Sequence, residues 1–278
     1  MWGLTMFTIH IPSYRRPEAF HTLEFLRGCG VSDDHIMVKP HICLYLNDDT
    51  DACSYAEKND LGRVKVTVMG QGVQSVVDAR NYILTHNPYP LIMMDDDITG
   101  FNYVTRVPGG KFRYQERNDM FVPTVEKLLA KCLKEHVAMF GFTPNRNALF
   151  AASGKKGYSY NRFVWGTFMC FLEQPTLAPP WCVVAEDAFY QIAFHAAGKR
   201  TLRFNLANFR KQIYQLGGCN TMTWRERWER DQGIRARLIA IYGDPAKTLF
   251  DSVPWDYDKD DEAHHRSIEK KRAAQQGE

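Results

Sequence analysis

Three consecutive aspartates, Asp95, Asp96 and Asp97, follow directly on the apolar run Leu91–Met94. Such a run is typical of a buried strand in an α/β sheet, and ligands of these sheets bind outside the carboxyl ends of the strands. On an extended backbone Asp95 and Asp97 point to the same side. Two carboxylates so close repel each other unless a cation lies between them, and hard oxygen ligands suit Mg²⁺ or Mn²⁺. The spacing therefore predicts Asp95 and Asp97 as metal ligands; a solvated acidic turn is the alternative.

A second acidic pair, Glu186 and Asp187, begins a predicted helix that runs to about residue 197 and ends at Gly198. Acids in a first helical turn are favoured by the helix dipole, and this explanation requires no chemistry. The functional alternative is a carboxylate base that takes the proton of a substrate hydroxyl. Both interpretations remain open on position alone.

The elements that must position these acids follow from the hydrophobic periodicity. In the first part we expect strands at 6–11, 36–46, 64–69 and 91–94, and helices at 17–27 and 73–84. In the second part we expect a hairpin at 98–107 and 111–114, helices at 122–136, 186–197 and 223–242, and strands at 138–143, 163–172 and 201–210. This order predicts an α/β fold with one catalytic domain at 1–250, divided into a nucleotide-binding half (1–98) and an acceptor half (99–250). A charged tail follows at 251–278.

Polar residues after the first two predicted strands are candidates for nucleotide contacts. Arg15 and Arg16 could face phosphates, and Tyr14 could stack on a base. Asp48, after the second strand, could hold a ribose or a base edge. Surface turns would explain both segments as well, because Asn and Asp are ordinary turn formers.

The bulk composition limits the class of protein. The 278 residues carry a net charge of only +3, but segment 145–237 holds 14 Lys and Arg against 6 Asp and Glu, a local excess of +8. This asymmetry is compatible with a polyanionic substrate or with a solvated basic face. The seven cysteines contain no C-x-x-C pair, which favours a reducing compartment. With no signal-peptide pattern and no apolar run of about 18 residues, we expect a cytoplasmic protein without membrane or obligate protein partners.

Four motifs in order resemble a GT-A-type nucleotide-sugar glycosyltransferase: the segment 12–17 (P-S-Y-R-R-P), residues 79–81 (A-R-N), the aspartates 95–97 as a D-x-D element, and the pair 186–187. They span about residues 7–200. The chain also resembles the phage TET/JBP-associated glycosyltransferases, which glycosylate 5-hydroxymethylated pyrimidines in DNA, in its compact length, its M-D-D-D-I acid motif and its basic second half. If it is phage-encoded, it would act in the host cytoplasm.

The resemblance implies a GT-A-like mixed sheet flanked by helices, with a C-terminal helical extension, an NDP-sugar donor (probably UDP-linked) and Mn²⁺ or Mg²⁺. Asp187, with Glu186 beside it, would be the general base if the anomeric centre is inverted, and Asp97, with Asp95, would bind the metal. The candidate nucleotide-sugar contacts are Pro12, Tyr14, Arg15, Asp48, Arg80, Asp95 and Asp96.

A DNA acceptor is the expected partner in the second half. Its candidate contacts are Lys155, Lys156, Arg162 and Trp165, with Arg210 and Lys211 as further phosphate contacts. A flipped 5-hydroxymethylcytosine or 5-hydroxymethyluracil could stack on Tyr158, Tyr160 or Trp165. His264 and His265 could supply a further metal ligand.

Other readings remain open. The acceptor could be protein, lipid or polysaccharide. A metal-dependent nucleotidyl- or phosphoryltransferase also needs paired aspartates, although the usual third acid or phosphate-cradling glycine loop is not evident. A catalytically silent nucleotide-sugar or DNA-binding module is the non-enzymatic alternative, but three adjacent aspartates are costly there without a cation.

Overall fold

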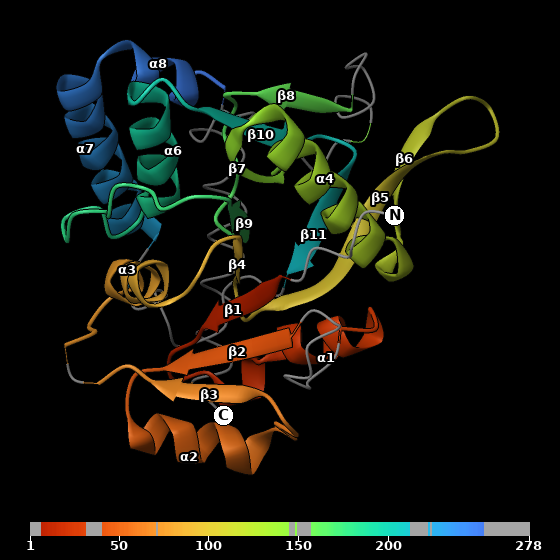
Figure 1. The fold of residues 1–278 in the computed structure, drawn as a ribbon, viewed down its shortest axis with the longest axis vertical. Coiled ribbons are helices and arrows are strands. Elements are labelled where there is room, and N and C mark those ends of the chain that lie inside the picture. The colour runs from red at the N-terminus through yellow and green to blue at the C-terminus, as the bar shows by residue number, and fades with distance from the viewer. Residues whose placement is uncertain are drawn as a thin grey trace.

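The computed structural model describes residues 7–31, 41–70, 72–144, 148, 157–211, 222 and 224–252. An eight-stranded mixed sheet runs through the molecule in the order β3-β2-β1-β4-β9-β7-β10-β8, and a smaller sheet has the order β11-β5-β6 (Figure 1). Residues on both sides of position 98 therefore contribute strands to the large sheet. The fold class is confirmed: an α/β protein with a mixed sheet flanked by helices.

The first half alternates strands and helices: β1 (Thr8–Pro12), α1 (His21–Gly28), β2 (His41–Leu46), α2 (Asp49–Lys58), β3 (Lys65–Val68), α3 (Val76–His86) and β4 (Leu91–Met94). These four strands are parallel. Parallel neighbours require crossover connections, which the helices provide. As a result, the segments that follow β1, β2 and β4 meet at one edge of the sheet.

The alternation of side chains along the strands divides the core into two clusters, one on each face. In β4, Ile92 and Met94 pack into a cluster with residues of α1 and of α4 (Phe121–Glu135). Leu91 and Met93 pack into the other, with residues of α3, α6 (Glu186–Ala196), α7 (Trp224–Tyr242) and α8 (Asp244–Phe250). All four strand residues are at most 1% exposed, so β4 is buried on both faces as its apolar sequence predicts.

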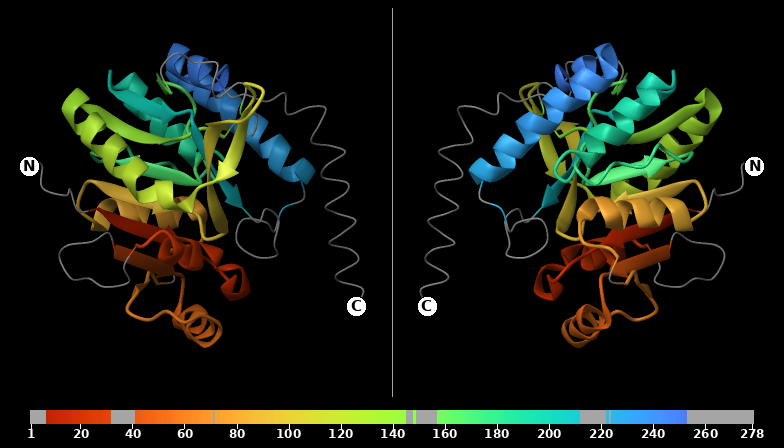
Figure 2. Two further views of the ribbon diagram at one scale, coloured as in Figure 1. Left: turned by 90° about the vertical axis from the view of Figure 1, so that its right-hand side faces the viewer. Right: turned by 90° about the vertical axis from the view of Figure 1, so that its left-hand side faces the viewer.

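The second half adds antiparallel strands. β9 (Phe168–Phe171) lies between β4 and β7 (Val137–Phe142) and runs antiparallel to both, and β10 (Arg200–Phe204) and β8 (Tyr158–Tyr160) complete the edge. The hairpin β5 (Ile98–Arg106) and β6 (Phe112–Glu116) pairs with β11 (Ala207–Lys211). The hairpin projects from the body of the molecule, while α7 and α8 cover the opposite side (Figures 1 and 2). Short 3-10 turns, η1 (Pro17–Ala19) and η2 (Asn118–Met120), precede α1 and α4.

The structure corrects two of the predicted elements and adds two helices. The predicted strand 163–172 begins only at Phe168, because the side chains of Gln191 and Asp187 on α6 bind the backbone at Val164 and Gly166 in place of a strand neighbour. The predicted strand 201–210 is in fact β10 and β11, which belong to different sheets. Helices α2 and α8 were not predicted. In α2 the acidic run thought to be a turn begins a helix, which Asp48 caps by accepting from the backbone N–H of Asp51 (2.9 Å).

No helix in the described part of the chain combines the length and the apolar character that crossing a membrane needs.

A half-buried histidine on α6 makes the stability of the fold depend on pH. His195 shares a hydrogen bond of 2.9 Å with Thr201 Oγ1, and burial lowers its pKa to about 4 from an ordinary 6.5. Between these values the unfolded chain binds a proton that the folded chain does not, so stability is lost as the pH falls through this window. The unfolding free energy of the wild type falls between pH 7.5 and pH 4.5. We expect this fall to be about 2 kcal/mol smaller in His195→Gln, which lacks the titrating group. Urea titrations of both proteins at the two pH values measure this, and equal losses would show that His195 does not control it.

Candidate functional site

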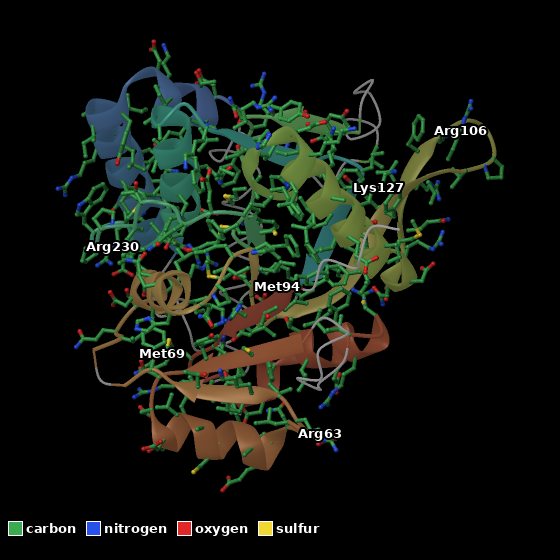
Figure 3. The ribbon with its side chains drawn as sticks, in the orientation of Figure 1. Arg63, Met69, Met94, Arg106, Lys127 and Arg230 are labelled. Carbon is green, nitrogen blue, oxygen red and sulfur yellow. The ribbon has the colours of Figure 1, made fainter. Side chains whose placement is uncertain are left out.

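The three aspartates form a tight turn between β4 and β5 that the first helix holds in place. Thr22 of α1 is fully buried; its hydroxyl donates to the carbonyl of Asp95 (2.7 Å) and accepts from the backbone N–H of Ile98 (2.9 Å), while its own N–H donates to the carbonyl of Asp96 (3.1 Å). The turn begins next to Met94, which lies near the middle of the molecule in Figure 3. The backbone of the acidic turn is therefore fixed before any ligand binds. The sequence gives no signal for this role of a threonine.

The side chain of Asp96 points into the protein, away from the side toward which Asp95 and Asp97 point. It is fully buried, it accepts from the Ser13 hydroxyl, and it pairs with the Arg16 guanidinium; Ser13 also bonds the Tyr55 hydroxyl. Burial raises the pKa of Asp96 to about 6, against the opposing effect of Arg16. Asp96 thus ties the loop after β1 to the acidic turn. A contact between Asp96 and a nucleotide stays a prediction.

Arg80 connects the two acidic pairs of the sequence. Its guanidinium is 4% exposed and lies 2.9 Å from Asp95 Oδ1, 2.8 Å from Glu186 Oε1 and 3.1 Å from the carbonyl of Gly166. Burial opposes its charge, but Glu186 and Asp95 together raise its pKa. The pKa of Glu186 rises to about 7 because burial outweighs the effect of Arg80. The structure therefore brings together the acids at 95 and 186, which are far apart in the sequence.

Asp187 is the more accessible member of the second pair. Glu186 is 7% exposed, whereas Asp187 is half-buried and accepts hydrogen bonds from the backbone N–H groups of Gly166 (2.8 Å) and Ala188 (2.7 Å). Burial raises the pKa of Asp187, and Arg80 opposes the shift. Each carboxylate oxygen has a second lone pair, so these two bonds leave capacity to accept a proton. Of the two acids, Asp187 is therefore the better candidate for contact with a substrate hydroxyl, and that role stays a prediction.

Gly166 contacts both Arg80 and Asp187 through its backbone. A Cβ on this residue would lie 2.8 Å from Arg80 Nη1 and 3.1 Å from Asp187 Oδ2. We expect Gly166→Ala to displace these groups and to lower any turnover that the site supports at least about tenfold, because a shift near 1 Å in a reacting group is costly. Turnover and the melting temperature of the variant measure this. Gly72→Ala is the matched control, since a Cβ there meets nothing within 4 Å. Normal turnover in Gly166→Ala would show that the spacing of these groups is not critical.

Lys211 lies between the two carboxylates predicted to bind a metal. Its ammonium nitrogen is 2.7 Å from Asp95 Oδ2 and 3.3 Å from Asp97 Oδ1, and its side chain is 12% exposed. Burial opposes its charge, but Asp95 and Asp97 raise the pKa of Lys211 above its ordinary value. The carboxylates are ligands of the right type for Mn²⁺ or Mg²⁺, yet no third His, Cys, Asp or Glu of the described chain joins them in a metal-binding group. In this arrangement the pair does not fit a divalent metal, and metal binding stays a prediction.

The other predicted nucleotide contacts lie along the edge where β1 and β2 end. Arg15 is exposed, has a left-handed backbone (φ 51°) and places its guanidinium 4.9 Å from the centre of the half-buried Tyr14 ring. Its backbone N–H donates to buried Asp51 (3.1 Å). Pro12 ends β1 beside this loop, and Asp48 caps α2. Asp51, which the sequence did not single out, fixes the loop conformation.

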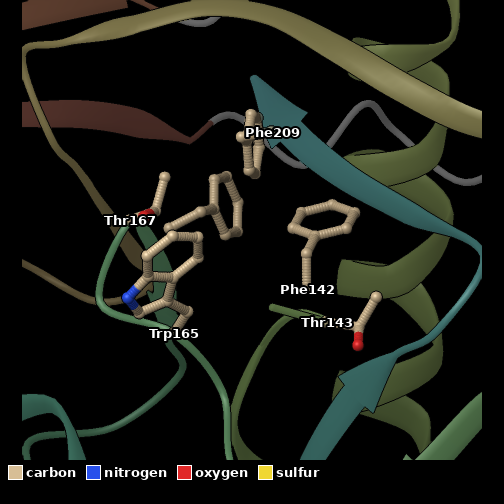
Figure 4. A pocket seen from close by; sticks show the side chains of 6 residues that line it. Phe142, Thr143, Trp165, Thr167 and Phe209 are labelled. Carbon is tan, nitrogen blue, oxygen red and sulfur yellow. The ribbon is translucent and has the colours of Figure 1, made fainter. Parts of the chain in front are cut away.

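The residues predicted to contact the acceptor lie in different environments. Arg162 is exposed, and Arg210 pairs with Glu116 (2.6 Å), whereas Lys211 is half-buried at the acidic turn. Trp165 lines a small pocket, shown in Figure 4, together with Phe142, Thr143, Thr167, Phe168 and Phe209. Tyr158 and Tyr160 lie on the edge strand β8. Lys155, Lys156, His264 and His265 lie outside the described residues.

Comparison with known proteins supports the fold. No protein-family profile and no curated protein matches the sequence. The structure aligns with the Pyrobaculum calidifontis mannosyltransferase PcManGT in complex with GDP-Man and Mn²⁺ at a TM-score of 0.52 and 13% identity, over 84% of this chain and 64% of that one. It aligns with S. aureus TarS 1-349 in complex with UDP at 0.50 and 13%, over 95% and 69% of the chains, and with a mycobacterial protein at 0.50 and 12%, over 86% and 75%.

At such low identity these likenesses establish the fold alone. The chain spans less than two thirds of the mannosyltransferase. The fold is GT-A-like, and a mannosyltransferase is among the solved structures that share it.

Proposed function

We propose that the protein is a glycosyltransferase that moves a sugar from an NDP-sugar to a hydroxyl acceptor. The observation that carries the proposal is the arrangement of Asp95, Arg80 and Asp187 at the carboxyl edge of the parallel strands in a GT-A-like fold. A cationic side chain there can stabilise the leaving diphosphate, and a carboxylate can accept the proton of the acceptor hydroxyl. The complexes of similar structures with GDP-Man and with UDP support a nucleotide-sugar as donor, and we expect UDP as its carrier.

In the proposed reaction the acceptor oxygen attacks the anomeric carbon as Asp187 takes its proton. The bond between that carbon and the phosphate oxygen breaks, and the nucleoside diphosphate leaves with the bonding electrons. Charge develops on the leaving diphosphate, and the buried cation of Arg80, held by Asp95 and Glu186, would offset it through the electrostatic field of the site. This single displacement inverts the anomeric centre.

For the acceptor we propose a 5-hydroxymethylated pyrimidine in DNA. The proposal rests on the resemblance of the sequence motifs, on the basic excess of segment 145–237, and on the partly exposed indole of Trp165 beside the site. An aromatic face of this kind can stack on a base that has left the duplex. Exposed Arg162 is a candidate phosphate contact.

The test is a transfer assay read by mass spectrometry. The protein is incubated with a panel of NDP-sugars and DNA that contains 5-hydroxymethylcytosine or 5-hydroxymethyluracil, and the digested nucleosides are weighed; unmodified DNA is the control. A gain of one sugar mass on the modified nucleoside alone is the expected result. Release of the nucleoside diphosphate without a gain of sugar on DNA would support the glycosyltransferase activity and overturn the proposal that DNA is the acceptor. A nucleotide-sized gain would indicate a nucleotidyltransferase, and no reaction with any donor would favour the binding module.

A further inference from the structure

The Lys211 ammonium occupies the space in which a divalent cation would bridge Asp95 and Asp97. Its nitrogen lies 2.7 Å from one carboxylate and 3.3 Å from the other. A bound Mg²⁺ would lie about 2.0–2.1 Å from its oxygen ligands, which requires the same gap. Two cations cannot share a gap of this size without strong repulsion. Lys211 and a metal are therefore alternatives at this site.

Backbone pairing sets the position of Lys211. Lys211 is the last residue of β11 and lies opposite Ile98 of β5, the residue that directly follows Asp97. The register shifts between Arg210 and Lys211, and such irregularities commonly redirect a side chain near a functional site. The Trp165 ring lies over the ammonium, 5.1 Å from its nitrogen. The lysine is thus positioned by the same sheet that carries the acidic turn.

Lys211 offsets part of the negative charge of the acid pair, and Arg80 divides its charge between Asp95 and Glu186. An ammonium has three N–H donors. Within the described part of the chain, the ammonium donates one hydrogen bond to Asp95 and forms a longer ion pair with Asp97, so donor capacity is left for an oxygen of a ligand.

We propose that Lys211 is the built-in cation of this site: it offsets the charge of Asp95 and Asp97 and contacts the donor diphosphate where a divalent metal would otherwise do so. The inference rests on the proposed use of an NDP-sugar. It changes the expected cofactor, because binding of the donor then requires no added metal.

The first experiment measures Mn²⁺ binding by the loss of the free-ion signal in electron paramagnetic resonance. We expect Lys211→Ala, which vacates the gap, to bind Mn²⁺ at least about tenfold more tightly than the wild type. Lys211→Met retains an apolar stem without the charge and serves if the alanine variant fails to fold. Lys199→Ala removes an exposed lysine that pairs with Glu173 and is the matched control. Equal Mn²⁺ affinity in the wild type and both Lys211 variants would overturn the proposal.

The second experiment measures UDP and GDP affinity by calorimetry, in EDTA and in Mn²⁺. The wild type is expected to bind its nucleotide equally well in both, and Lys211→Ala to bind about 10–100-fold more weakly in EDTA, as for the loss of a charge-assisted hydrogen bond. A wild type that binds only with Mn²⁺, or a Lys211→Ala that binds as tightly as the wild type in EDTA, would contradict the inference. If the wild type bound no nucleotide under either condition, the proposed function would fail, while the Mn²⁺ titration would still decide whether the lysine excludes the metal.

Discussion

Asp187→Asn is expected to lower the rate of sugar transfer by about 10²–10⁴-fold, the range typical for loss of a general base. The carboxylate is half-buried at the first turn of α6 and is held by the N–H groups of Gly166 and Ala188. An asparagine has nearly the same shape and can accept from one of the two backbone N–H groups, while its NH2 faces the other, and its amide cannot take the proton of the acceptor hydroxyl. The variant should therefore bind the donor normally and fail at the chemical step.

Turnover at saturating donor and acceptor, the Michaelis constant for the donor and the melting temperature separate these effects. We expect turnover to fall while the other two stay near their wild-type values. Asp119→Asn, which changes an exposed aspartate that pairs with Arg117, is the matched control. Turnover within a few-fold of the wild type would assign the base to another group, and an unchanged anomeric configuration in the product would exclude single displacement.

Local pattern in the sequence was enough to predict the framework of the site. The strand at 91–94 is where its apolar run predicts it, because burial on both faces demands apolar residues at every position. The hairpin at residues 98–116 and the helix at 224–242 also match their patterns, since turn glycines and helical periodicity are properties of neighbouring residues. These elements depend on near neighbours and were predicted, whereas α2 and α8 were missed although their start signals are also local.

The partners of the acids were not predictable in the same way. Lys211 lies 116 residues from Asp95 in the sequence and was interpreted as a DNA contact. A basic residue in a basic segment does not indicate which residue it will pair with in the folded protein. Gln191 and Asp187 bind the backbone of the loop at 163–167, so an apolar sequence that looks like a strand is not one. In each case a side chain from a distant element decides the outcome.

The largest expected effect on stability is at Arg80. Its guanidinium is the shared partner of Asp95 and Glu186, and Arg80→Met would leave both carboxylates without it in a site from which water is largely excluded. Breaking a buried ion pair by removal of one partner costs about 3–5 kcal/mol. We expect that loss in the unfolding free energy, measured by urea titration at pH 7.5. Arg117→Met, at an exposed arginine paired with Asp119 (2.7 Å), should leave the midpoint unchanged.

A second substitution tests whether the cost arises from the unpaired charge. Arg80→Met combined with Glu186→Gln removes the buried carboxylate that Arg80 compensates, so the double variant should regain about 1 kcal/mol or more over Arg80→Met alone. Because the pKa of Glu186 is about 7 even with Arg80 present, loss of the arginine should favour its protonated form, and Arg80→Met should be less destabilised at pH 5.5 than at pH 8. Additive effects of the two substitutions and a pH-independent loss would show that Arg80 stabilises the fold by packing and not by joining the two acidic pairs.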